Sequence, residues 1–116
     1  MNRLEQQLLR DTVGNSSPRF ILRTRTRVDT GRWTRRSPLW LCIMDDEIVL
    51  LSVGRRRYLQ RRPLEDCRES HYNAARGGLV IAPGDGLRFP CLEMPVADAL
   101  KALDFIHSTH ETKQRC

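Results

Sequence analysis

Arginine is the residue type of this sequence that is best suited to bind a ligand. Arginines recur at every second position of segment 23–27, within a stretch that alternates between apolar and polar residues. Because successive side chains of a strand point to opposite faces, this spacing predicts one basic face. A guanidinium group binds a carboxylate or phosphate through two parallel hydrogen bonds, so such a face suits an anionic ligand or partner. The candidate binding residues are Arg23, Arg25, Arg27, Arg35, Arg36, Arg55, Arg56 and Arg57.

A solvated face without a ligand is the alternative interpretation of this pattern. Outward positions i and i+2 of a strand are about 6.7 Å apart, and two like charges at that separation in water repel by only about 0.6 kcal/mol. The row of arginines therefore needs no bound anion. The residue pattern leaves both interpretations open.

Residues that could serve catalysis or metal binding form no known motif. The four cysteines stand 25, 24 and 25 residues apart, without a Cys-x-x-Cys pair, and the first three are predicted to be small buried residues. Segment 107–111 reads His-x-x-His-Glu, which places potential ligands on one side of a helix, but no fourth ligand is evident elsewhere. Neither a phosphate-binding glycine loop nor a Gly-x-Ser-x-Gly elbow is present. We therefore expect no enzyme activity, no catalytic residue, no metal site and no cofactor.

The positive charge is concentrated in one half of the chain. Residues 19–62 contain twelve arginines and four acidic residues, whereas residues 63–116 contain six basic and eight acidic residues, and the net charge is +6. Such a field attracts phosphates, nucleic acid or anionic lipid. Eighteen of the twenty basic residues are arginine, a preference that a coding bias toward arginine would also produce.

The length and the apolar runs predict one domain that does not cross a membrane. A chain of 116 residues buries enough surface to fold without disulfides or metal. The longest apolar runs, 39–44 and 48–53, are far shorter than the ~20 residues that a membrane-spanning helix needs. The first residues lack the apolar core of a signal peptide, so we expect a cytoplasmic protein.

The strongest structural signal is a hairpin over residues 39–53. Two apolar runs flank the acidic segment Asp45–Glu47, a pattern typical of two strands joined by a tight turn. A two-residue loop within this segment would pair Ile43 with Ile48. The register stays open because both faces of the hairpin are apolar, which also predicts that this is the most buried part of the protein.

Shorter segments complete a mainly β chain of six or seven strands. Besides 19–28 and the hairpin, strands are predicted at 58–62, 64–72, 79–82 and 87–91. The last of these contains Pro90 and is therefore assigned to a sheet edge.

One amphipathic helix is predicted at about 95–108, with Pro95 in its first turn. Its apolar stripe is expected to pack against the sheet, so that a charge at Leu100 or Leu103 would unfold the protein. Residues 1–18 are predicted to be a loosely docked leader with a short helix and a linker, and residues 109–116 a tail. The apolar stripe consists of Val96, Ala99, Leu100, Leu103 and either Ile106 or His107.

This order of elements resembles the pleckstrin-homology-like (PH-like) domains, including bacterial domains of unassigned role. The resemblance rests on the hairpin around the acidic turn, on the basic strand leading to Arg62-Pro63-Leu64-Glu65-Asp66, on the run 78–81 and on the closing helix. It covers residues 19–108. It implies a barrel of two nearly orthogonal antiparallel sheets capped by the helix.

The resemblance implies a non-catalytic binding or scaffolding module that docks a protein partner or an anionic ligand such as a lipid headgroup. Lipid-binding members combine basic residues at the end of the first strand with a basic-x-Arg pair on the second strand, and segment 38–42 lacks that pair. Nonspecific nucleic-acid binding through the same basic surface is the alternative. Exposed strand edges also allow a homodimer.

Overall fold

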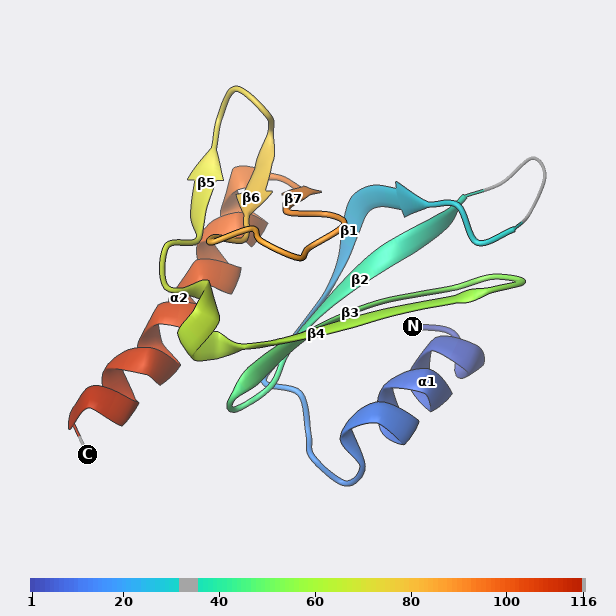
Figure 1. Ribbon diagram of the computed structural model, residues 1–116, viewed down its shortest axis with the longest axis horizontal. Helices are drawn as coiled ribbons and strands as arrows, with labels where there is room; N and C mark the ends of the chain where they lie inside the picture. Colours follow the sequence, from blue (N-terminus) through green and yellow to red (C-terminus); the bar gives the residue numbers. More distant parts are fainter. Residues whose placement is uncertain (32–35, 116) are drawn as a thin grey trace.

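Two antiparallel sheets and two long helices form the structure, a computed structural model that describes residues 1–31 and 36–115, with side chains through residue 107 (Figure 1). One sheet has the strand order β1-β2-β3-β4, and the other has the order β5-β6-β7. The mainly β class with a C-terminal helix is therefore confirmed. The elements are α1 (Arg3–Val13), β1 (Phe20–Val28), β2 (Ser37–Ile43), β3 (Glu47–Val53), β4 (Arg57–Pro63), the 3₁₀ turn η1 (Leu64–Cys67), β5 (His71–Asn73), β6 (Gly78–Val80), β7 (Cys91–Glu93) and α2 (Val96–Arg115).

The β2–β3 hairpin forms in the register of the two-residue loop. Ile43 pairs with Ile48, and the Met44 N–H donates to the Glu47 carbonyl at 2.8 Å across the turn. Apolar residues of both strands are fully buried on both faces, as the sequence predicts. Each face must therefore be covered by a different part of the chain.

Strand β1 alternates as predicted, with its arginines exposed and Thr24 and Val28 buried. The register between β1 and β2 shifts between Arg23 and Arg27, so the strand bulges within the arginine row. The Thr24 hydroxyl donates to the Leu39 carbonyl at 2.7 Å in the buried part of this region. A bulge bends a strand and redirects its side chains, which separates Arg23 from the arginines that follow.

The second sheet is shorter than the sequence predicts. The expected strand 64–72 is instead the turn η1 followed by β5. Only the end of the expected strand 87–91 enters β7, at the predicted sheet edge, because Pro90 has no N–H to donate to a ladder. The loop before it is held to β4 by the Gln60 side-chain amide, which donates to the Gly86 carbonyl at 2.7 Å.

Helix α2 covers one face of the four-stranded sheet and contacts the second sheet as well. Ala99, Ala102 and Ile106 are buried in the core that it shares with both sheets, whereas Val96 and Leu100 are 49% and 57% exposed. The expected position of Leu100 on the buried stripe is therefore wrong. Small alanines face the sheets because they allow the helix to approach closely.

The second helix also runs further than predicted, to Arg115 instead of about residue 108. Residues 107–115 contain neither glycine nor proline, so nothing in the sequence stops the helix there. The segment that was expected to be a tail therefore continues α2.

Helix α1 is not the loosely docked arm that the sequence predicts. Leu8 and Leu9 are buried against Cys42, Val49 and Leu51 on the other face of the four-stranded sheet. A local sequence pattern does not indicate this docking, because the partners of α1 lie more than thirty residues away along the chain. As Figure 1 shows, α1 and α2 lie on opposite sides of this sheet.

The two sheets do not close into a barrel within the described residues. No strand pair joins them; β1 and β7 meet where the Glu93 N–H donates to Thr26 Oγ1 at 2.9 Å. Strands β5, β6 and β7 have three residues each, too few to continue the ladder of β1 or β4. Helix α2 and the side chains between the sheets fill the core instead.

Candidate anion-binding site

The arginines of β1 line two neighbouring pockets. Arg25 and Arg27 face a pocket of about 350 Å³, which we call the arginine pocket. Arg23, on the other side of the bulge, faces a pocket of about 440 Å³ beside the start of α1. Arg36 lines both pockets and connects them. The arginine pocket is lined by Arg25, Thr26, Arg27, Arg36, Arg76, Cys91 and Glu93.

Three separate parts of the chain position the four arginines of the arginine pocket. The bulged half of β1 carries Arg25 and Arg27, and Arg36 directly precedes β2. Arg76 comes from the turn between β5 and β6, where its N–H donates to Asn73 Oδ1 at 3.1 Å. Gly77 follows with φ +67°, a conformation that L-residues rarely adopt, and its N–H donates to the Asn73 carbonyl. The turn that presents Arg76 is thus held in one shape.

The charges around the arginine pocket are unbalanced. Its lining residues include four arginines and one acidic residue, Glu93. The ion pairs formed among the described residues are Arg19 with Asp45 at 3.6 Å and Arg61 with Glu47 at 2.6 Å, so none of the pocket arginines is neutralised there. Arg27 Nη1 donates to the Arg36 carbonyl at 3.4 Å. Within residues 1–31 and 36–107 the other guanidinium N–H groups of these exposed side chains make no hydrogen bond, so they can bind an anion.

The pocket beside α1 is less basic. It contains Arg23 and Arg36 together with the carboxylate of Glu5. That carboxylate is already engaged: it accepts from the Asn2 N–H at 2.8 Å and from Trp40 Nε1 at 2.6 Å. These bonds fix the first turn of α1 against the sheet, so this pocket is a structural junction with a basic rim.

The structure does not bring every predicted arginine to the site. Arg55, Arg56 and Arg57 are exposed in and beside the β3–β4 turn and line neither pocket. This turn lies against the end of β1, where the Arg56 N–H donates to the Thr30 carbonyl at 2.8 Å. Arg35 lies outside the described residues.

Arg76 is the residue that the sequence analysis missed. It stands in a turn with few neighbouring charges, in the half of the chain whose net charge is negative. Its position beside β1 follows from the packing of the second sheet, a long-range contact that no local pattern indicates. The turn signal at 75–78 predicts a loop, but it does not indicate which part of the chain lies beside that loop.

Two of the cysteines, Cys42 and Cys67, are not activated as nucleophiles. Burial raises the pKa of the Cys42 thiol to about 12 and that of the Cys67 thiol to about 11, so both stay protonated at neutral pH. Among the side chains of residues 1–31 and 36–107, no three from His, Cys, Asp or Glu cluster as metal ligands.

Neither helix, over the residues described, combines the length and the apolar character that crossing a bilayer requires. Comparisons of the sequence with family models and curated proteins, and of the fold with solved structures, found no match. The site must therefore be interpreted from its own chemistry.

Proposed function

We propose that this chain is a non-catalytic binding module of PH-like architecture that holds an anionic, phosphate-bearing ligand in the arginine pocket. The observation that carries the proposal is the convergence of four arginines, from three parts of the chain, on one pocket of about 350 Å³ without a carboxylate partner in ion-pair contact among the described residues. Guanidinium groups bind phosphate oxygens in a fixed fork geometry, and several forks around one cavity favour a ligand with several anionic oxygens.

The order of elements supports the PH-like part of the proposal. Four antiparallel strands are followed by three more and then by a helix that contacts both sheets. The sequence lacks the basic-x-Arg pair on the second strand that lipid-binding members use. In this chain Arg36 and Arg76 supply the additional guanidinium groups from the segments around the pocket.

Three probes test the proposal, because the same phosphate chemistry occurs in different ligands. They are inorganic tripolyphosphate, vesicles of phosphatidylcholine with and without a phosphatidylinositol phosphate, and a short single-stranded oligonucleotide. We expect one of the first two to bind and to raise the thermal unfolding midpoint of the protein. A marked preference for the oligonucleotide, with affinity that falls steeply with salt, would replace this proposal by the nucleic-acid alternative.

A pair of charge-matched variants shows whether binding is local to the pocket. Arg25→Ala/Arg76→Ala removes two charges from the pocket, and Arg55→Ala/Arg57→Ala removes two charges from the β3–β4 turn. Each charge-assisted hydrogen bond contributes about 1.5 kcal/mol or more, so we expect roughly tenfold weaker binding per pocket arginine and little change in the control. Equal losses in both variants, or no binding of any probe at low salt, would refute the pocket as the site.

A further inference from the structure

The face of the four-stranded sheet under α1 consists of two rows of side chains that cross all four strands. One row is Ile21, Cys42, Val49 and Arg61, and the next is Arg23, Trp40, Leu51 and Leu59, as the strand registers show. The central members Cys42, Val49 and Leu51 are fully buried beneath α1. At the two edges Ile21 and Leu59 remain 43% and 40% exposed. One helix thus covers the middle of this face and leaves a flank on each side.

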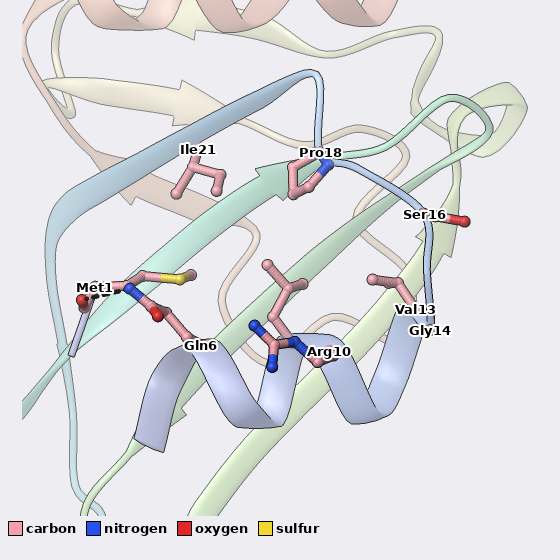
Figure 2. Close-up of a pocket in the computed structure, with 9 residues that line it drawn as sticks. Met1, Gln6, Arg10, Val13, Gly14, Ser16, Pro18 and Ile21 are labelled. Carbon is pink, nitrogen blue, oxygen red and sulfur yellow. Dashed lines mark hydrogen bonds between the residues drawn. The ribbon is translucent and has the colours of Figure 1, made fainter. Parts of the chain in front are cut away.

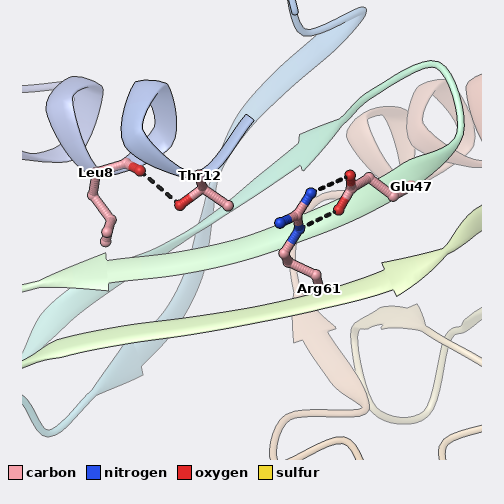
Figure 3. A network of polar contacts seen from close by, with 4 residues as sticks. All are labelled: Leu8, Thr12, Glu47 and Arg61. Atoms are coloured by element: carbon pink, nitrogen blue, oxygen red, sulfur yellow. Dashed lines mark hydrogen bonds and ion pairs between the residues drawn. The ribbon is translucent and has the colours of Figure 1, made fainter. Parts of the chain in front are cut away.

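The flank along β4 has its charge satisfied within the chain. Arg61 donates two hydrogen bonds of 2.6 Å to the carboxylate of Glu47 on β3, as Figure 3 shows. Thr12 of α1 lies nearby and donates to the Leu8 carbonyl at 2.7 Å. An arginine at this edge is therefore matched by an acidic side chain from the neighbouring strand.

The flank along β1 has the same pattern of an apolar residue, Ile21, and an arginine, Arg23, but among the described residues Arg23 has no ion-pair partner. A groove of about 370 Å³ separates α1 from β1, and Figure 2 shows side chains of the helix and the strand facing each other across it. Its apolar wall is formed by Leu9, Val13, Pro18 and Ile21, and Arg10 adds a positive charge. We call this the α1–β1 groove.

The groove leads directly to Arg23. Met1 lines both the α1–β1 groove and the pocket that contains Arg23, so the two hollows adjoin. Ile21 and Arg23 project from the same face of β1, about 7 Å apart for positions i and i+2 of a strand. Within the described residues neither Arg10 nor Arg23 forms an ion pair.

We propose that the α1–β1 groove is a docking site for an acidic segment of a partner protein, whose large apolar side chain packs beside Ile21 while a carboxylate pairs with Arg23. The flank along β4 supports this proposal, because Glu47 there supplies the carboxylate that binds Arg61. On the flank along β1, the partner supplies the carboxylate that binds Arg23. In the partner, the apolar residue and the carboxylate stand two positions apart in an extended segment or four apart in a helix.

Charge complementarity favours this occupant over a second copy of the chain. The protein carries a net charge of +6, Arg10 lines the groove, and Arg23 lines the pocket that adjoins it. A symmetric contact would bring these like charges together. An acidic segment would neutralise them and cover Ile21 at the same time.

A selection from displayed random peptides of twelve residues on the immobilised full chain tests the inference. We expect enrichment of sequences with an aromatic or large aliphatic residue and an acidic residue two or four positions away. The enriched peptides are then synthesised and their affinities measured for the parent and for variants. No enrichment, or enrichment of neutral or basic sequences, would overturn the proposal.

The opposite flank provides a matched control. Ile21→Ser and Leu59→Ser make the same kind of change at two half-exposed edge positions, and Arg23→Ala removes the proposed charge contact. We expect about tenfold weaker peptide binding for Ile21→Ser and for Arg23→Ala, and unchanged binding for Leu59→Ser. Equal losses for the two serine variants would overturn the site, and thermal unfolding of each variant verifies that it is folded. Retained peptide binding by Arg25→Ala/Arg76→Ala would separate this groove from the arginine pocket.

Discussion

The two faces of the four-stranded sheet are buried in different ways. On one face Leu39, Leu41 and Leu50 enter a core that the second sheet and α2 share. On the other face Cys42 and Leu51 are covered by α1 alone. The first face is enclosed by the second sheet and α2, whereas the second is covered by a single helix, and its edges stay open.

The two faces therefore differ in what their residues contribute to the stability of the fold. The enclosed face leaves no arginine and no cavity for a ligand among its central residues. The partly covered face carries exposed Ile21, exposed Leu59 and the first arginine of the β1 row. Substitutions at these exposed edge positions are therefore expected to have little effect on the core.

Introducing a charge on the buried side or on the exposed side of α2 should give the largest difference in stability between two variants. Ala102→Asp places a carboxylate in the fully buried core, with no partner, and we expect a loss of roughly 4 kcal/mol or more, enough to unfold a small domain. Leu100→Asp changes a residue that is 57% exposed, and we expect a change within about 0.5 kcal/mol. Circular dichroism during thermal unfolding measures both. An unfolded Leu100→Asp protein would show that α2 docks through the other stripe.

Two adjacent leucines of β3 allow a direct comparison of how much each face contributes to stability. Leu50 and Leu51 are both fully buried, but Leu50 points to the enclosed face and Leu51 points to α1. We expect Leu50→Ala to cost about 4 kcal/mol and Leu51→Ala about 2 kcal/mol, because a single helix can settle into the cavity more readily than two packed layers. Urea unfolding gives both values. Equal costs would mean that α1 is held as rigidly as the core.

The contact between Glu5 and Trp40 should contribute less than either leucine. Trp40 Nε1 donates to the Glu5 carboxylate at 2.6 Å, and a hydrogen bond to a charged group contributes about 1.5–3 kcal/mol. A double-mutant cycle with Glu5→Ala and Trp40→Phe isolates this coupling, which we expect at about 1.5 kcal/mol. Additive effects of the two substitutions would show that apolar packing alone holds α1.

The smallest effect is expected from the ion pair on the β4 flank, and it depends on pH. Hydrogen bonds from Arg61 lower the pKa of the Glu47 carboxyl below its ordinary value of 4.5. The pair therefore stabilises the protein fully above about pH 4.5, and this contribution is lost as the pH falls through the lowered pKa. Glu47→Gln should cost less than about 1 kcal/mol at neutral pH, and the difference from the parent should vanish in acid. A difference that grows in acid would contradict the pairing.

Local patterns predicted those parts of the fold that neighbouring residues determine. The alternation around Arg23 gave the exposed face of β1, and the acidic turn gave the hairpin. The register of that hairpin could not be chosen beforehand because both faces are apolar. In the structure both faces are apolar because each is covered: one by α2 and the second sheet, the other by α1.

The docking of α1, the orientation of α2 and the position of Arg76 depend on long-range packing, which local sequence patterns do not indicate. Helix α1 contains few large apolar residues, and its docking depends on Trp40 and Leu51 of the sheet. On α2 Leu100 of the expected stripe is exposed, while Ala99 and Ala102 are buried in the core. Arg76 joins the arginine pocket through the packing of a distant turn. In each case a partner far along the chain determines the position.

The thiol of Cys42 offers a way to observe the motion of the first helix. It has no exposed surface beneath α1, and its raised pKa keeps it protonated, so reagents reach it only when the helix leaves the sheet. Cys91 is only half-buried and provides an internal reference for reagent access. The rate of Cys42 modification in the native protein therefore measures how often α1 opens, and a peptide that bridges the helix and β1 would slow this reaction without touching the sulfur atom.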